Sequence, residues 1–155
     1  MACSKCDNPL TPKEFKYSIS HYGIALCREC QEDYEPLKKK FEKQKNRSTP
    51  EAIKLHGILV KLGVNAKLEQ YDRFKHIDIA IPDADLNLEI DGMQHSYSEK
   101  QALADLKRTY YSLKKGYITL RIPNKLIQEN AYETAKYLKK LIEENEDQID
   151  DEDLF

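Results

Sequence analysis

The 155-residue chain lacks a long apolar run, and this absence excludes a membrane-spanning helix. No segment approaches the roughly 18 uncharged apolar residues that such a helix needs, and the N-terminus has no apolar signal segment. We therefore expect neither membrane insertion nor secretion, and we expect an intracellular, cytoplasmic protein. The chain also has no Trp, only five Gly and no internal repeat, while 40% of its residues are hydrophobic and 34% are charged. This composition is typical of a globular protein with one modest core.

The net charge is also small, because the chain has 25 Lys and Arg and 27 Asp and Glu, which give a formal net charge of −2. Such a balance argues at first against a nucleic-acid partner. The charges are segregated, however, since the segment 143–155 (EENEDQIDDEDLF) holds eight acids and no Lys or Arg. The preceding 142 residues carry 25 basic against 19 acidic groups, so nucleic acid stays open as a partner.

Basic residues are densest in one short segment, 38–47, which reads KKKFEKQKNR. The segment is either a solvated helix or linker, or a surface that contacts DNA phosphates. Contacts of that kind supply affinity and orientation without reading the base sequence. The six candidates for DNA binding here are Lys38, Lys39, Lys40, Lys43, Lys45 and Arg47.

All four cysteines lie near the N-terminus, in two CxxC pairs separated by 20 residues. Each pair, Cys3 with Cys6 and Cys27 with Cys30, places two thiolates about one turn apart, so that both can bind one ion. Four thiolates complete a tetrahedral site with Zn–S bonds of about 2.3 Å and leave no open position for water. We therefore predict a structural zinc finger over 1–35 rather than a catalytic zinc.

Two other interpretations of the cysteines are a pair of disulfides and a thioredoxin-like redox pair. Without a secretion signal, disulfides are disfavoured because the compartment is reducing. The segment 15–26 (FKYSISHYGIAL) is expected to form a β-hairpin that turns near His21. The finger is therefore expected to be a zinc ribbon or a treble clef, and the helix-prone sequence after Cys30 favours the treble clef.

The remainder of the chain carries helix and strand signals in the order α-β-β-β-α-β-α. Thr49 as N-cap and Pro50 at the first helical position mark a helix start, and Gly63 marks its end. Short alternating runs bounded by turn residues mark the strands. We expect helices over 49–62, 98–115 and 130–144, and strands over 64–68, 76–81, 86–91 and 117–122.

The chain thus divides into several parts. We expect a four-cysteine zinc finger over 1–35, a basic linker or helix over 36–48, an α/β domain over 49–144 and an acidic, disordered tail over 145–155. The tail ends in Leu154-Phe155 and resembles the acidic tails with which single-strand-binding proteins dock partners. It is therefore a candidate contact for a protein partner. Its alternatives are a solubilising end and a segment that folds onto the basic surface.

The chemistry of the main domain is expected on its second and third strands (HIDIAI and LNLEID). The short loop between them pairs Ile81 with Leu86. This register sets Asp78 opposite Glu89 on the polar face, and Asp91 follows on that face. Like charges directly opposed on a sheet are destabilising. The three acids therefore either stay hydrated on an exposed face or hold a hard divalent cation such as Mg²⁺.

These residues resemble the core of very-short-patch-repair (Vsr)-like endonucleases, a family of the PD-(D/E)XK nuclease superfamily. The resemblance begins with Asp78 followed by the run EIDGMQH (89–95). It includes Glu51 as a fourth carboxylate early in the first helix, where an acid also stabilises the helix N-terminus. It covers roughly 49–123, about half the chain, and its remaining residues are Asp105, Arg108, Gly116, Tyr117, Leu120, Arg121 and Ile122.

The resemblance implies a restriction-endonuclease-like αβββαβα core with a central mixed sheet, and Mg²⁺ or Mn²⁺ bound near Asp78 and Glu89. Superfamily members carry a Lys two residues after the second acid, where it assists the attacking water, but this chain has Asp91 there. Vsr-like relatives share this form, so we do not interpret it as inactivation. Asp91 is then a further metal ligand or a carboxylate base.

Further residues gain roles from the same resemblance. His95 would orient water or act as general acid on the leaving oxygen, although a His at a strand end is often structural. Gln94 would position water or the sugar-phosphate. Arg108 and Arg121 are candidates for phosphate contacts. Arg108 can equally form a surface ion pair with Asp105, and Arg121 can equally be a partner for the carboxylates or an ordinary surface residue.

The expected function is metal-assisted hydrolysis of DNA phosphodiester bonds by an endonuclease or nickase, in repair, restriction, recombination or mobile-element processing. The expected substrate is double-stranded or branched DNA, and the cofactors are structural Zn²⁺ and catalytic Mg²⁺ or Mn²⁺. Alternatives are a non-catalytic zinc-finger DNA-binding or adaptor protein on a degenerate nuclease fold, and an RNA-directed nuclease. A monomer, which nicks one strand, and a homodimer are both compatible with the sequence.

Overall fold

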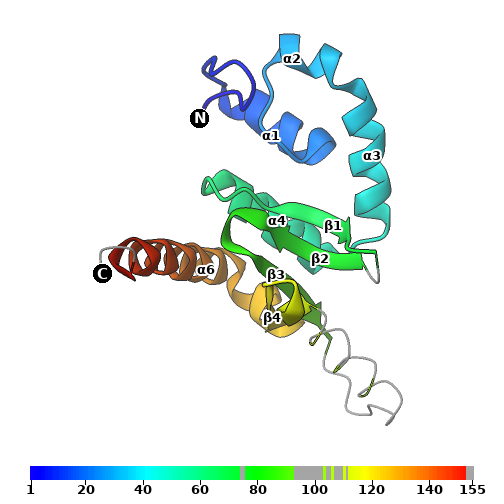
Figure 1. The fold of residues 1–155 in the computed structure, drawn as a ribbon. Helices are drawn as coiled ribbons and strands as arrows, with labels where there is room; N and C mark the ends of the chain where they lie inside the picture. The colour runs from blue at the N-terminus through cyan, green and yellow to red at the C-terminus, as the bar shows by residue number, and fades with distance from the viewer. Residues whose placement is uncertain (74–75, 93–102, 104–105, 107–109, 111, 153–155) are drawn as a thin grey trace.

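The structure of the chain is a computed structural model that describes residues 1–73, 76–92, 103, 106, 110 and 112–152. It is an α/β fold, in which helices pack on a four-stranded mixed sheet and a small helical module precedes the sheet (Figure 1). No helix of the described residues is long and apolar enough to cross a membrane.

The N-terminal module consists of a loop with the first cysteine pair, followed by helices α1 (Pro12–Tyr22) and α2 (Arg28–Asp33). Its small hydrophobic cluster includes Leu10, Tyr22 and Leu26, which are all buried. This cluster is separate from the larger core around the sheet.

The hairpin expected over 15–26 is wrong, because the described segment between the cysteine pairs forms helix α1. The Thr11 hydroxyl accepts a hydrogen bond from the Glu14 N–H, and the Glu14 carboxylate accepts one from the Thr11 N–H. This capping box starts the helix. Gly23, with φ 73, ends it in the left-handed conformation that glycine favours. The expected hairpin of a ribbon or treble clef is thus replaced by a helix.

The basic stretch forms helix α3 (Glu35–Asn46) and not an irregular linker. Leu37 packs against the cluster of the N-terminal module, whereas Phe41 is 5% exposed and belongs to the core around the sheet. The Lys45 ammonium donates a hydrogen bond to the carbonyl of Ser20 at the end of α1. Helix α3 therefore contacts both hydrophobic clusters. In Figure 1 it runs from the N-terminal module to the sheet domain.

Helix α4 (Pro50–Lys61) confirms the helix expected from its capping signals. The Thr49 hydroxyl accepts a hydrogen bond from the Ala52 N–H, and Gly63 follows the helix with φ 88. The helix buries Ala52, Leu55, His56 and Leu59.

The sheet contains β1 (Lys67–Tyr71), β2 (His76–Ile81), β3 (Leu86–Asp91) and β4 (Ile118–Pro123). The strands lie in the order β1-β2-β3-β4. β1 with β2 and β2 with β3 are antiparallel, whereas β3 and β4 are parallel. The expected pairing of Ile81 with Leu86 is confirmed.

The first strand differs from its expected range, 64–68. It begins at Lys67, which pairs with Ala80, and it continues to Tyr71. Val64 instead completes the turn after α4, because its N–H donates to the Leu59 carbonyl. The alternation in this stretch therefore marked a strand that starts three residues later.

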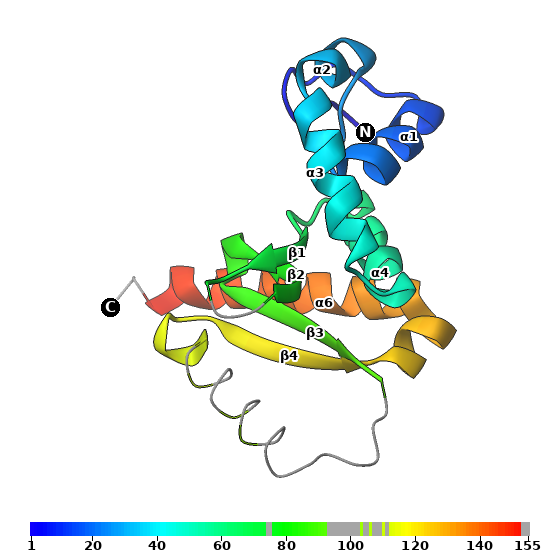
Figure 2. The same cartoon turned by 90° about the vertical axis from the view of Figure 1, so that its right-hand side faces the viewer.

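The core lies on one face of the sheet, where α4 and α6 (Asn124–Glu152) cover the strands (Figure 2). Apolar side chains of both helices pack against alternate residues of the strands. Burial of this apolar surface is the main source of stability for the fold. The strand residues in the core are Leu68, Ile79, Ile81, Leu86, Leu88, Ile90 and Ile122.

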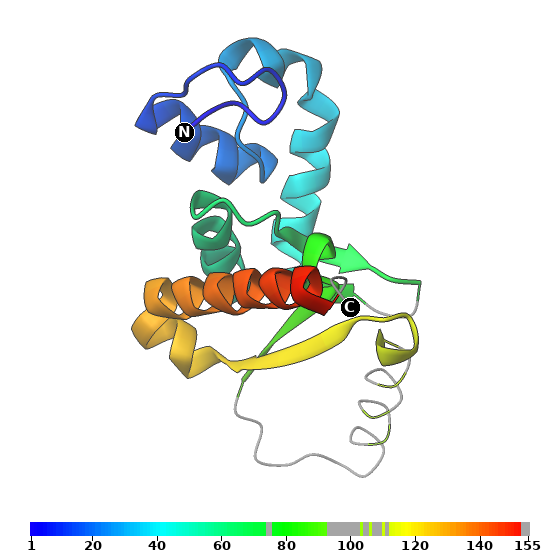
Figure 3. The same ribbon diagram turned by 60° about the vertical axis from the view of Figure 1, so that its left-hand side comes forward.

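The last helix is longer than the expected 130–144, because α6 runs from Asn124 to Glu152 (Figure 3). Asn130, with φ −142 and ψ 46, interrupts its helical geometry at the point where the sequence predicted the start. Past the expected end, the backbone stays helical through most of the acidic segment. The helix expected over 98–115 lies largely outside the described residues, although residues 112–114 are helical.

His56 of α4 is buried at 2% exposure, and its Nε2 atom lies 3.0 Å from the Ala66 carbonyl oxygen. Burial lowers the pKa of this His from 6.5 to about 4, although the hydrogen bond to Ala66 acts in the opposite direction. Between pH 6.5 and pH 4, His56 therefore binds a proton in the unfolded chain but not in the folded chain. We expect acidification across this range to remove about 3 kcal/mol of the free energy of unfolding.

Urea unfolding at pH 7.5 and pH 4.5 measures this contribution, with His56→Gln as the comparison. Gln retains a donor for the Ala66 carbonyl but does not titrate. Other titrating groups contribute equally to both proteins, so the wild type should lose more stability on acidification than the variant. An equal loss in the two proteins would show that His56 is not the acid-sensitive group.

Candidate functional site

The carboxylates of β2 and β3 lie on the face of the sheet opposite α4 and α6. Ile79 pairs with Leu88, and both belong to the core on the other face. The next step of the same register brings Asp78 level with Glu89. Asp91 alternates with the buried Ile90 and therefore follows Glu89 on the polar face.

Charged residues continue in one row across the sheet at this level. On one side, Glu69 of β1 lies level with Asp78 of β2, because the residues directly before and after Glu69 are paired with β2 in this register. On the other side, Glu89 pairs with Arg121 of β4. Glu69 has a φ of 50, and its carboxylate is 2.9 Å from Nδ1 of His76. The four strands thus each supply one charged residue to this row.

The predicted catalytic acids also make contacts within the protein. The Asp78 carboxylate accepts a 2.8 Å hydrogen bond from the Ile90 N–H, so it is held against β3. The Asp91 carboxylate accepts a 3.1 Å hydrogen bond from the Arg121 guanidinium. That ion pair is more than one third exposed, so its contribution to stability is small. Its effect is to hold the direction of the Asp91 carboxylate.

Glu51, at the start of α4, lies near the end of the sheet that carries Asp91. Its carboxylate accepts a 2.8 Å hydrogen bond from the side-chain amide of Gln128 in α6. This bond holds the pKa of the Glu51 carboxyl below its usual value, because it favours the charged form. Gln128 lies five residues after Pro123, which pairs with Asp91, and this places Glu51 near the end of β3 and β4.

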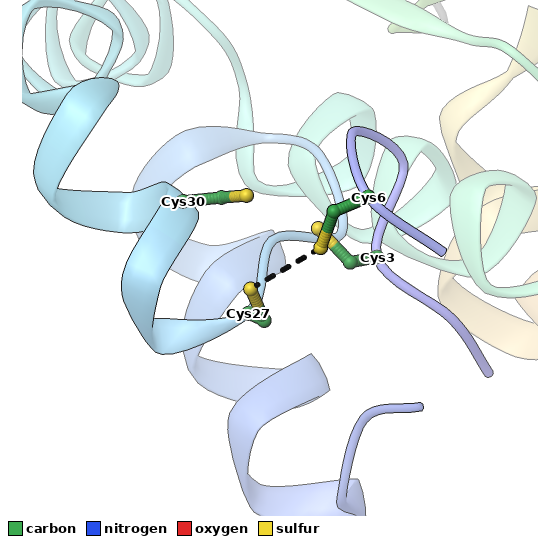
Figure 4. Close-up of side chains that lie close together, drawn as sticks. All are labelled: Cys3, Cys6, Cys27 and Cys30. Atoms are coloured by element: carbon green, nitrogen blue, oxygen red, sulfur yellow. Dashed lines mark hydrogen bonds between the residues drawn. The ribbon is translucent and has the colours of Figure 1, made fainter. Parts of the chain in front are cut away.

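The four cysteines form the group of potential metal ligands that the described residues bring together. Cys3 and Cys6 come from the N-terminal loop, and Cys27 and Cys30 come from the start of α2 (Figure 4). Their sulfur atoms all lie within 4.8 Å of one another, and Cys6 Sγ is 3.6 Å from Cys27 Sγ. All four are free cysteines, so the disulfide interpretation does not hold.

This spacing fits a tetrahedral tetrathiolate site, since metal–sulfur bonds of about 2.3 Å place the sulfurs about 3.8 Å apart. Burial raises the pKa of the Cys3 thiol, but backbone N–H groups of Cys27, Lys5 and Cys6 outweigh this effect and hold it at about 6. Hydrogen bonding with the Cys27 thiol raises the pKa of Cys30 well above its usual value. One thiolate is therefore favoured here, and a divalent cation is what allows all four to ionise.

Helix α3 presents a stripe of basic side chains away from its packed face. Lys39, Lys43 and Arg47 follow each other at intervals of four residues, so they lie on one face, and Lys40 lies beside them. All four are exposed, whereas Phe41 on the other side of the helix is buried. Lys38 and Lys45 are only half-exposed and contact Glu35 and the carbonyl of Ser20. The basic stripe is therefore Lys39, Lys40, Lys43 and Arg47.

The other predicted residues are not all on this face of the sheet. Gln94, His95 and Arg108 are outside the described residues. Asp78, Glu89, Asp91 and Arg121 share one face of the sheet, whereas the cysteines belong to the separate N-terminal module. The sequence thus led to two distinct sites, and the structure keeps them apart.

Glu69 was missed by the sequence analysis, although it lies level with the predicted acids. The reason is that the first strand was expected to end at Leu68. The alternation of Leu68, Glu69 and Gln70 opposite HIDIAI was the signal that could have found it. Its side chain is 7% exposed, and its carboxylate has a polar partner in Nδ1 of His76.

Comparison with known protein families finds no model that matches the chain, and comparison with curated proteins finds no relative. Among solved structures, the catalytic domain of the homing endonuclease I-Bth0305I is similar, with 16% sequence identity and a TM-score of 0.48. The match covers 60% of this chain and 93% of that domain.

Proposed function

We propose that the protein is a metal-dependent DNA endonuclease of the Vsr-like, PD-(D/E)XK type, with a restriction-endonuclease-like core. The observation that carries the proposal is the register of β2 and β3, which brings Asp78 level with Glu89 on the face opposite the core. Carboxylates gathered on one face of a sheet repel each other unless a cation offsets them. Oxygen ligands of this kind are those that Mg²⁺ prefers.

In this proposal, Asp78 and Glu89 hold the catalytic cation. When bound, Mg²⁺ or Mn²⁺ polarises the scissile phosphate and lowers the pKa of a bound water. Asp91 accepts the proton of the attacking water. Arg121 holds the Asp91 carboxylate in its orientation through their 3.1 Å contact. Glu51, held by Gln128, supplies further negative charge at the same edge.

The basic stripe of α3 provides the contact with DNA. Its four exposed cations lie on a helix that also packs against the sheet, so phosphates bound there have a fixed position relative to the catalytic face. This contact is electrostatic and independent of base sequence. Arg108 and Arg121 are proposed as additional phosphate contacts.

The cysteine module is proposed to be a structural zinc finger that forms a unit of its own over 1–35. Four thiolates at this spacing favour Zn²⁺ and leave no coordination position for substrate. The main domain, 49–144, would then carry the catalytic function. His95 and Gln94 are proposed to act on the leaving oxygen and the water.

A second candidate function is a non-catalytic DNA-binding adaptor on the same fold. The observation that favours it is that the acids already have protein partners, Asp78 at the Ile90 N–H and Asp91 at Arg121. An adaptor would bind DNA through α3 without hydrolysis. The acidic segment 143–155 is a proposed contact for a protein partner under either function.

DNA cleavage tests the proposed function directly. Supercoiled, linear, branched and single-stranded DNA are incubated with the protein in Mg²⁺, in Mn²⁺ and without added divalent ion. We expect nicked or cut product only with the divalent ion, because the carboxylates need it to activate water. The product is measured on gels as a function of time.

A matched pair of variants separates the enzyme from contaminating nucleases. Glu89→Gln removes the proposed ligand, whereas Glu133→Gln alters an exposed acid of α6 whose partner is Lys136. Activity in the wild type and in Glu133→Gln, with none in Glu89→Gln, supports catalysis. Absence of cleavage on every substrate, or equal cleavage by Glu89→Gln, favours the adaptor instead.

A further inference from the structure

A cavity of about 350 Å³ lies on the same polar face of the sheet as the catalytic acids, but nearer to β1 and the start of β4. Its floor includes Ala80 of β2 and Asn87 of β3, which pair with each other. Ser112 and Tyr117, which precede β4, close another side. The cavity is therefore built by residues from distant parts of the chain.

Two buried polar residues line this cavity. Asn87 is 2% exposed and Ser112 is 4% exposed, and both line it. Within the described structure, neither Oδ1 of Asn87 nor Oγ of Ser112 has a hydrogen-bond partner, and the same holds for Oγ1 of Thr119, which pairs with Asn87. Buried polar groups cost stability when they are unpaired. The burial of Asn87 and Ser112 beside the cavity makes its lining polar and not purely apolar.

The remaining lining residues indicate what the ligand is. Lys67, Arg73 and Lys115 are cations, and Asp72 is the one acid among the lining residues that the structure describes. Two tyrosines, Tyr71 and Tyr117, add aromatic rings. Cations attract phosphate, aromatic rings stack on bases, and an Asn amide offers a donor and an acceptor to a base edge.

We propose that this cavity binds one unpaired nucleotide of a DNA strand, with its base directed at Asn87 and Ser112. The inference rests on the proposed function, because it treats DNA as the substrate. The volume is at the lower end of the range of small-molecule pockets, about 300–1,000 Å³, which suits one nucleotide and not a duplex. A metal ion does not fit the lining, because the described lining residues include three cations and one acid.

The position of the cavity relates the bound nucleotide to the bond that is cut. Ala80 lies two residues after Asp78, and Asn87 lies two residues before Glu89. Two residues of a strand span about 7 Å, so the cavity lies directly beside the proposed metal ligands. A nucleotide held there would be adjacent to the scissile phosphate. The enzyme would then prefer DNA with a single extruded or unpaired nucleotide.

Binding measurements without cleavage test this inference. Labelled duplexes carry either one central unpaired nucleotide or an abasic residue at that position, and affinity is measured by fluorescence anisotropy without added divalent ion. We expect the wild type to bind the duplex with the base about tenfold more tightly, because stacking and hydrogen bonds to the base are lost in the abasic duplex. Asn87→Leu should remove this preference.

Matched variants separate the loss of base binding from the loss of folding. Asn87→Leu fills a buried position of similar size, and thermal unfolding reports whether it folds. Ser112→Ala is a second, milder change that should reduce the preference, and Asn65→Leu changes an exposed Asn outside the cavity and should retain it. Equal affinity of the wild type for both duplexes, or an unchanged preference in folded Asn87→Leu and Ser112→Ala, would overturn the proposal.

Two further comparisons show which ligand the cavity binds and whether binding and cleavage go together. Free deoxynucleoside monophosphates that bind as tightly as the duplex with the unpaired base would overturn the assignment to a DNA strand. The failure of catalysis is distinguishable from the failure of this inference, since binding is measured without metal. A preference for the unpaired base in a protein that cuts no DNA would support the cavity and reject the endonuclease, whereas cleavage without the preference would do the reverse.

Discussion

Asp78→Asn is expected to lower the rate of DNA cleavage by at least about 100-fold while the protein stays folded. Metal-ion catalysis supplies several kcal/mol of transition-state stabilisation, and about 2.7 kcal/mol corresponds to a factor of 100. Asn removes the charge that binds the cation but retains a carbonyl oxygen. That oxygen can still accept the hydrogen bond from the Ile90 N–H, so the link between β2 and β3 is kept.

A second substitution at the same position separates catalysis from folding. Asp78→Ala removes both the metal ligand and the acceptor, so it should be inactive and also less stable by about 1–3 kcal/mol. Asp83→Asn, in the exposed turn between the same strands, should leave both properties unchanged. Rates come from single-turnover cleavage and stability from urea unfolding. An active Asp78→Asn protein would rule out Asp78 as a metal ligand.

Loss of the metal from the cysteine site is expected to unfold the N-terminal module and leave the sheet domain intact. Structural Zn²⁺ contributes about 10–16 kcal/mol of apparent binding energy in small zinc domains. The cluster around Leu26 contains few apolar side chains, so it cannot replace that energy. The core around the sheet has its own larger cluster, so we expect it to stay folded without the metal.

Cys27→Ser tests this expectation, with Ser4→Ala in the neighbouring loop as the control. The wild type and Ser4→Ala should release one zinc ion per chain to a colorimetric chelator, and Cys27→Ser should release much less. Limited proteolysis should then cleave Cys27→Ser within α1 and α2 but spare the strands. Full protease resistance of a zinc-free protein would show that the module folds without a metal.

The strands of the candidate site could be predicted from the sequence because local patterns determine them. In HIDIAI and LNLEID, apolar and polar residues alternate, and one face must be buried, so a shift of one residue would expose every Ile and Leu. The short turn then fixes which residues pair. Asp78 and Glu89 follow from these two constraints. Thr49 and Pro50 located the start of α4 for an equally local reason.

Other features depend on interactions that the sequence pattern does not reveal. The segment 15–26 is rich in residues with strand propensity, yet residues 15–22 are helical, with a capping box at Thr11 and a buried Tyr22. The contact of Glu51 with Gln128 joins residues far apart in the chain. The cavity at Asn87 was not predicted, because a single Asn in a strand carries no local signal of what lies above it.

Helix α3 also limits how the protein can change in length. Leu37 faces the cysteine module and Phe41 faces the sheet, while Lys43 and Arg47 lie on the basic stripe. Insertion of one residue between Leu37 and Phe41 would rotate one end of the helix by about 100° relative to the other. The helical phase of α3 thus couples the orientation of the module to the direction of the basic stripe. Related chains should therefore tolerate length changes in the loops before and after α3, but not within it.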